Sequence, residues 1–128
     1  MSNYNSSNNR AVWFDIPVTD LDRAAAFYGA VLGIKVSKEE FDGCAFGVLE
    51  HQDGNGGCLI VNASEVAADK GILVYMNVNS RMKDAITQVT ENGGRVVQPV
   101  HSIGPHGFRA IVLDSEGNRI ALHSTVDS

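Results

Sequence analysis

Residues 13–18 (WFDIPV) and residues 73–78 (LVYMNV) decide the fold, because they open two stretches of sequence that match at an offset of 73 − 13 = 60 positions. Both segments are rich in the β-branched and aromatic residues that are typical of strands. A helical pattern follows each segment, at residues 20–32 and 80–92, and a glycine stands directly after each helix. The chain therefore predicts one structural unit, repeated.

Each predicted helix is followed by three short apolar segments that are typical of strands. They are expected at about residues 34–38, 44–50, 57–62, 94–98, 107–113 and 119–124. Strands that follow one another without an intervening helix favour antiparallel pairing, so the fold class is α+β. Two βαβββ modules, residues 11–62 and 72–124, joined by a linker at residues 63–71, form a single domain over residues 11–124. Each module is too small to bury a good core alone, which places the site at their junction.

Composition excludes several classes of function. The 128 residues are 44% hydrophobic and 20% charged, as in ordinary globular domains. No apolar run is long enough for a membrane span, and residues 1–10 (MSNYNSSNNR) resemble a disordered polar tail rather than a signal peptide. We therefore expect a cytoplasmic protein in which Cys44 and Cys58 are reduced, buried thiols. A net charge of −5 without a basic cluster argues against nucleic acid as a partner.

Two motifs carry a resemblance to a known family. Residues 18–33 (VTDLDRAAAFYGAVLG) and residues 113–122 (LDSEGNRIAL) resemble the opening and closing motifs of the vicinal oxygen chelate superfamily, which holds glyoxalase I, bleomycin resistance proteins and extradiol dioxygenases. The resemblance covers about residues 11–124. It implies an open, cup-shaped mixed sheet with helices on the outside, a small molecule bound in the cup, and a homodimer.

The resemblance also implies where a metal would bind. Catalytic members of the superfamily hold a divalent metal with side chains from the first and last strands of each module. Counted from the two motifs, those positions are Trp13, Ile60, Leu73 and Ala121. None of these side chains offers a ligand suited to a divalent cation, so we expect no metal site and no cofactor.

Strand alternation predicts which side chains face the cup. Trp13 and Asp15 share one face of the first strand, Tyr75 and Asn77 share a face of its repeat, and Arg119 and His123 share a face of the last strand. His106, in a Pro-His-Gly turn, is expected at the cup mouth. We assign Asp15, Tyr75 and His123 as candidate catalytic groups. The expected ligand-binding residues are Trp13, Asn77, Arg119 and His106.

The candidates also have structural interpretations: Asp15 is a solvated carboxylate at the strand end or is paired with Arg119, and Trp13 belongs to the core. Tyr75 and Asn77 make structural hydrogen bonds, and His106 and His123 are surface residues. Three functions remain open. The first is a metal-independent glyoxalase-like protein that binds a small molecule, with acid–base chemistry of the lyase or isomerase type. The second is a protein that only sequesters a drug or metabolite. The third is a metal-dependent lyase or dioxygenase of the same superfamily.

Overall fold

The computed structural model describes residue 9 and residues 11–128. The predicted disordered tail lies outside the described residues, Asn9 excepted. The first module consists of β1 (Asp15–Val18), α1 (Leu21–Leu32), β2 (Val36–Phe41), β3 (Cys44–Leu49) and β4 (Cys58–Val61). The second consists of β5 (Tyr75–Asn77), α2 (Met82–Glu91), β6 (Arg95–Ser102), β7 (Phe108–Leu113) and β8 (Arg119–Ser124).

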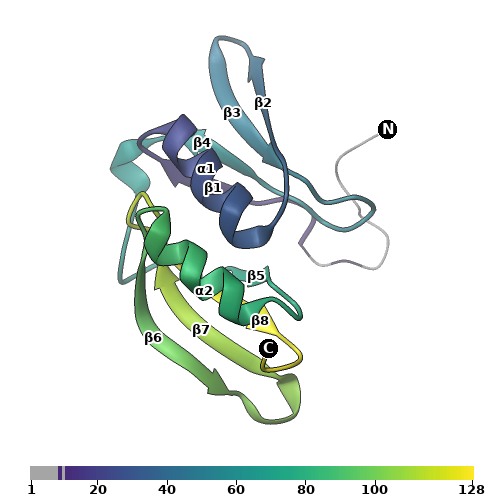
Figure 1. Cartoon of the computed structure of the whole chain (residues 1–128). Helices are drawn as coiled ribbons and strands as arrows, with labels where there is room; N and C mark the ends of the chain where they lie inside the picture. Colours follow the sequence, from purple (N-terminus) through teal and green to yellow (C-terminus); the bar gives the residue numbers. More distant parts are fainter. Residues whose placement is uncertain (1–8, 10) are drawn as a thin grey trace.

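The two modules have the same topology. Their sheets have the strand orders β1-β4-β3-β2 and β5-β8-β7-β6, and in each the first strand runs parallel to the last strand while the other neighbours are antiparallel. Figure 1 shows α1 and α2 side by side in front of the sheets, with β1 and β5 toward the middle of the molecule. The predicted α+β class and the tandem βαβββ order are confirmed.

Local sequence explains where α1 begins and ends. The Asp20 carboxylate accepts a hydrogen bond from the Arg23 N–H at 3.0 Å and caps the first turn. Gly33 ends the helix with φ of 67°, in the left-handed region that suits glycine. The helix is thereby held in one register, and its buried face packs on the first sheet.

One core joins both modules. From the helices it takes Ala24, Phe27, Tyr28, Val31, Met82, Ala85 and Val89. The residues that alternate with the predicted cup-facing positions are all buried, which confirms the alternation: Ile16, Val18, Met76, Val78, Ile120 and Leu122. The opposite faces of β1, β5 and β8 are therefore the ones turned away from the helices, as the cup requires.

The strands differ from the prediction mainly at their ends. Strand β1 begins at Asp15 and β5 at Tyr75, so Trp13 and Leu73 precede the strands rather than lie within them. Strand β1 starts at Asp15 because its partner strand, β4, begins only at Cys58, which pairs with Asp15. The linker carries a 3-10 turn, η1 (Ala63–Glu65), and the Pro-His-Gly turn forms a second, η2 (Gly104–His106).

Neither helix among the described residues has the length and apolar content needed to cross a bilayer. Cys44 and Cys58 are both free thiols. Cys58 is buried, as expected, but Cys44 is exposed. The expectation for Cys44 is wrong because β3 pairs with β4 only from Phe46 onward, which leaves the β2–β3 hairpin to project alone (Figure 1).

Candidate functional site

On the first module, the face turned away from the helices carries a carboxylate beside an indole and a thiol. The Cys58 Sγ donates to Asp15 Oδ1 at 3.2 Å. Burial, together with this hydrogen bond, raises the pKa of the Cys58 thiol to about 11, although a hydrogen bond with Trp13 opposes the shift. Trp13 is half-buried and packs edge-to-face on His51, with ring centroids 5.9 Å apart. Asp15 is exposed, so its carboxylate is open to a ligand.

The register of the sheets corrects one predicted position. Asp15 pairs with Cys58 as Tyr75 pairs with Ala121. Cys58, rather than Ile60, is therefore the counterpart of Ala121 on the closing strand of the first module. The error arose because the long β3–β4 loop hides where β4 starts.

The residues at these positions do not fit a divalent metal. Trp13, Leu73 and Ala121 have no suitable donor, and Cys58 holds its proton for a hydrogen bond to Asp15. Over the described part of the chain, no three His, Cys, Asp or Glu side chains gather in a way that could hold a metal ion.

On the second module, Arg109 links three strands on the face turned away from α2. Its Nη1 donates to Tyr75 Oη at 2.7 Å, and its Nε donates to His101 Nε2 at 3.2 Å. His101 Nε2 is thus an acceptor, and its Nδ1 donates to the Pro99 carbonyl at 2.8 Å. The two bonds require the neutral Nδ1–H form of His101. The Tyr75 hydroxyl accepts from Arg109, which leaves its own proton available to a ligand.

His123 is held by the turn that was expected at the cup mouth. Its Nε2 lies 2.7 Å from the His106 carbonyl, so this nitrogen carries the proton and Nδ1 is left as an acceptor. The side chain of His106 is exposed and only its backbone contributes. Asn77 pairs with His123 across β5 and β8, and its Oδ1 accepts from the Asn79 N–H at 2.8 Å.

Arg119 forms no ion pair with Asp15. Its Nη2 donates to the Gly71 carbonyl at 3.1 Å, while its Nε is buried without a hydrogen-bond partner. The alternative pairing of Asp15 with Arg119 is therefore wrong, because the linker takes the guanidinium and the Cys58 thiol takes the carboxylate.

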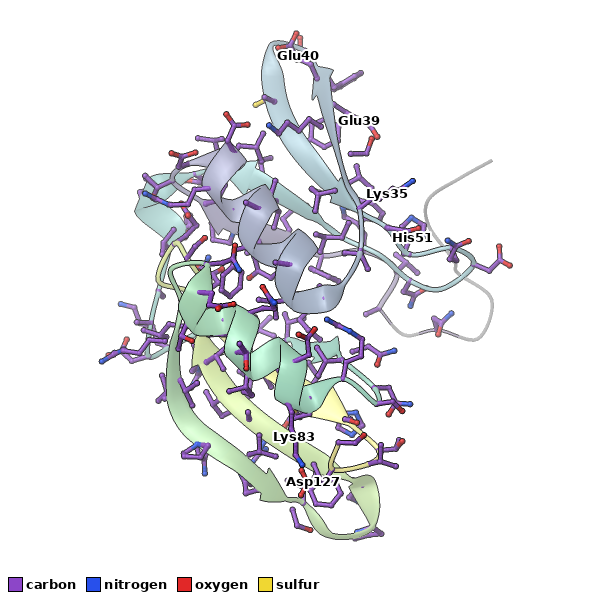
Figure 2. All side chains as sticks on the ribbon, viewed as in Figure 1. Lys35, Glu39, Glu40, His51, Lys83 and Asp127 are labelled. Atoms are coloured by element: carbon purple, nitrogen blue, oxygen red, sulfur yellow. The ribbon has the colours of Figure 1, made fainter. Side chains whose placement is uncertain are left out.

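A cleft of about 540 Å³ lies between the β3–β4 loop and β5. Its apolar wall comes from Phe14, Leu32, Ile34, Leu49 and Met76, and polar residues of both modules form its rim. Tyr75 and Asn77 line this cleft, whereas Trp13, Asp15, Arg119 and His123 do not. Figure 2 shows His51, another lining residue, on the loop that extends from the first module.

Sequence reasoning missed Cys58, His51, His101 and Arg109. Alternation along residues 107–113 places Arg109 opposite the buried Ala110 and Val112, so that signal was present. His101 had no such signal, because its strand is irregular; it is half-buried and bonded to Arg109.

Comparisons with known proteins agree with the fold. A family model described as bleomycin resistance protein-like N-terminal matches residues 10–46. A glyoxylase-like domain-containing protein of Didymella fabae is 32% identical over 114 residues, which cover 84% of this chain and 88% of the relative. A hypothetical protein from S. aureus has a TM-score of 0.69 at 23% identity, over 92% of this chain and 95% of the other. A fosfomycin resistance protein from Listeria monocytogenes has a TM-score of 0.68 at 12% identity, over 92% and 94%.

Proposed function

Because this chain belongs to the vicinal oxygen chelate superfamily of glyoxalase-like and bleomycin resistance proteins, we propose that it binds a small organic molecule in its cup without a resident metal. The observation that carries the proposal is the chemistry at the ligand-facing positions. Trp13, Cys58, Leu73 and Ala121 are poor metal ligands, but the same face offers organic recognition groups. An indole, a carboxylate, a phenol and an imidazole are typical of a small-molecule pocket.

These groups also support acid–base chemistry of the lyase or isomerase type. Asp15 and the Nδ1 of His123 are candidates for the base, because each has acceptor capacity left. Tyr75 is the candidate acid, because Arg109 donates to its oxygen and leaves its proton to be given. In this proposal the reacting atom lies between β1 and β5, and the chain's own side chains move the proton.

The alternative is sequestration without chemical change. Its support is that Asp15, an exposed carboxylate beside an aromatic wall, suits binding as well as catalysis. The two hypotheses differ in one observable: a sequestering protein returns its ligand unchanged after release, whereas an enzyme returns a product.

We further propose that the protein is a homodimer and acts in the cytoplasm. The dimer is supported by the β2–β3 hairpin, which extends beyond β4 and exposes 76% of Phe41. A two-stranded ribbon with an exposed aromatic residue gains stability when a second copy covers it. A sedimentation mass near twice 13.7 kDa is expected, and a mass of 13.7 kDa at micromolar concentration would refute the dimer. Two free thiols suit a reducing compartment.

The binding proposal is tested by titrating the protein with a panel of neutral, cationic and anionic organic molecules. Trp13 is the single tryptophan, so its fluorescence reports the cup directly. At least one compound should shift the emission, and adding a divalent metal should not displace it. Each compound that binds is then recovered and analysed for chemical conversion. Elemental analysis of protein purified without a metal-affinity tag should find no stoichiometric divalent ion. The proposal is contradicted by one tightly held metal ion per chain, or by the lack of any change in Trp13 fluorescence with every compound of the panel.

A further inference from the structure

Four polar side chains form a row across the whole second sheet. In the strand register His101 on β6 lies opposite Arg109 on β7, Arg109 opposite His123 on β8, and His123 opposite Asn77 on β5. Directly opposed residues of neighbouring strands have their Cβ atoms about 5 Å apart on one face of the sheet. This polar row therefore crosses the cup side of the module from its outer edge to the junction.

Arg109 is the fixed charge of the polar row, and its partners are neutral. The guanidinium donates to the Tyr75 hydroxyl and to the neutral His101 ring. It forms no ion pair with any described carboxylate, unlike Arg23, Lys38 and Arg81. Two of its five N–H groups are used in these bonds, so three remain for another acceptor. A half-buried arginine held rigid in this way is prepared to bind an anion.

The equivalent row of the first module has the opposite character. There the register joins Pro17 on β1, Ile60 on β4, Phe46 on β3 and Glu39 on β2. The first three are half-buried and apolar, and Glu39 is exposed on the projecting hairpin, as Figure 2 shows. The repeat has therefore kept the geometry of the row, but the first copy is apolar over Pro17, Ile60 and Phe46, here called the apolar row, and the second copy is polar and cationic.

We infer that the polar row is the subsite for an anionic group, such as a carboxylate, on a small amphiphilic organic ligand. This inference rests on the proposed function and names the class of ligand for the same cup. Arg109 contacts the anion with its free N–H groups, Tyr75 adds its hydroxyl proton, and His101 positions the guanidinium. The apolar row of the first module takes the hydrocarbon part. Arg109 thus sets specificity for charge, in a chain whose net charge of −5 would otherwise disfavour an anion.

The test uses two probes of nearly equal shape, 3-phenylpropionate and its neutral amide, 3-phenylpropanamide, titrated calorimetrically into the full chain. The carboxylate should bind at least about 10-fold more tightly than the amide. Arg109→Gln should weaken the carboxylate by about 10- to 100-fold, the range for a hydrogen bond to a charged group, and leave the amide unchanged. Arg109→Lys keeps the positive charge but lacks the planar, two-pronged guanidinium, so its loss of affinity for the carboxylate should lie between those of the unmodified protein and Arg109→Gln.

Lys83→Gln is the matched control. It removes one positive charge from α2, on the helix side of the sheet, and Figure 2 shows Lys83 close to Asp127 at the C-terminal end of the chain. Neither probe should change affinity in this variant. An unchanged affinity of the Arg109→Gln protein for the amide also reports that it is folded.

The outcomes separate the two levels of the argument. Equal binding of acid and amide by the unmodified protein, or an equal loss of both in Arg109→Gln, would overturn the anion subsite while small-molecule binding stands. If neither probe binds and no compound of the broader panel changes the Trp13 fluorescence, both the proposed function and the anion subsite are overturned.

Discussion

The two connections that join the last strands of the modules, the β7–β8 turn and the β3–β4 loop, have equivalent positions but make different contacts. The β7–β8 turn, residues 114–118, is tied to the first module: Glu116 accepts hydrogen bonds from the backbone N–H groups of Thr19 and Asp20 at 2.9 and 2.7 Å. Asn118 Nδ2 donates to the Pro17 carbonyl at 2.7 Å. We call this contact the closed junction.

The β3–β4 loop, residues 50–57, makes no such connection to α2. Several of its side-chain hydrogen bonds reach partners within the first module, for example that from His51 Nδ1 to the Gly54 carbonyl at 3.0 Å. Instead it lines the cleft of about 540 Å³ beside Tyr75. We call this region, the β3–β4 loop and the cleft that it lines beside β5, the open junction. The difference teaches that the repeat supplies two similar interfaces, of which one stabilises the pairing of modules and the other borders an open cleft.

The largest expected effect is the loss of the closed junction. Asp114 is 2% exposed and accepts from the Tyr28 hydroxyl at 2.6 Å and from two backbone N–H groups of its own turn. Burial, and then the Asp114 charge, raises the pKa of Tyr28, which therefore remains a donor. Asp114→Ala leaves these buried donors unpaired, so the free energy of unfolding should fall by about 4 kcal/mol in urea denaturation.

The matched control for that variant is Asp53→Ala. Asp53 is an aspartate in the loop of the open junction and, unlike Asp114, it is exposed. Because its carboxylate is at the solvent-exposed surface, its substitution should lower the free energy of unfolding by about 1 kcal/mol or less. Similar losses in both variants would erase the distinction between the two junctions.

The reactivity of the Cys58 thiol reports how often the β3–β4 loop of the open junction exposes it to solvent. Cys58 follows the β3–β4 loop directly, and its pKa is raised from 9.0 to about 11, first by burial and then by Asp15. A shift of that size lowers the thiolate fraction about 100-fold at neutral pH. A thiol reagent should therefore label the exposed Cys44 rapidly and Cys58 at least about 100-fold more slowly.

Cys44→Ser isolates the slow reaction, and unfolding the protein in denaturant should make Cys58 react at an ordinary rate. If Cys58 reacts as fast as Cys44 in the native protein, the loop opens far more often than the structure indicates. Ligand binding in the cup should slow the labelling of Cys58 further.

The closed junction also predicts a response to acid. Burial raises the pKa of the Glu116 carboxyl, but hydrogen bonds from Arg23, Asp20, Ser115 and Thr19 outweigh it and lower the pKa from 4.5 to about 2. A depressed folded-state pKa contributes stability above pH 4.5 that is lost as the pH falls toward 2. The unmodified protein should lose about 1 kcal/mol over that window after allowance for solvent screening.

Glu116→Gln should remove that part of the acid response. Its unfolding free energy should be lower than that of the unmodified protein at pH 6, and the two curves should converge near pH 2. Parallel curves over the whole window would show that Glu116 does not couple the modules.

Much of the fold could be predicted from the sequence because the sequence patterns of both modules indicate the same order of helices and strands. The 60-residue offset, the helix stripes and the alternation of residues such as Ile16 and Met76 all depend on local spacing, and the structure agrees with them. Strand starts could not be predicted, since they depend on where the partner strand begins. Cys58 begins β4, and the long loop before it leaves no local mark of that position.

The candidate site could be predicted only on the strands whose alternation is regular. Tyr75, Asn77 and His123 lie on the expected face, but the polar row as a whole was not foreseen. Strand β6 is the reason: its register shifts between Val96 and Gln98 and again between Gln98 and His101. Each irregularity breaks the two-residue period, so the face of His101 can be assigned only once its partner Arg109 is known.

The smallest expected effect concerns the aromatic contact that holds the open junction to the cup. Trp13 and His51 pack edge-to-face at 89°, which joins the segment before β1 to the β3–β4 loop. His51→Ala removes this contact and should lower the free energy of unfolding by about 0.5–1 kcal/mol. Because Trp13 is the single tryptophan, the loss should also shift its emission toward that of a more solvated indole. Gln52→Ala, one residue along the same exposed loop, should leave the emission unchanged. A larger loss of stability in His51→Ala than in Asp114→Ala would reverse the comparison, since the loop that lines the cleft would then hold the molecule together more strongly than the buried turn.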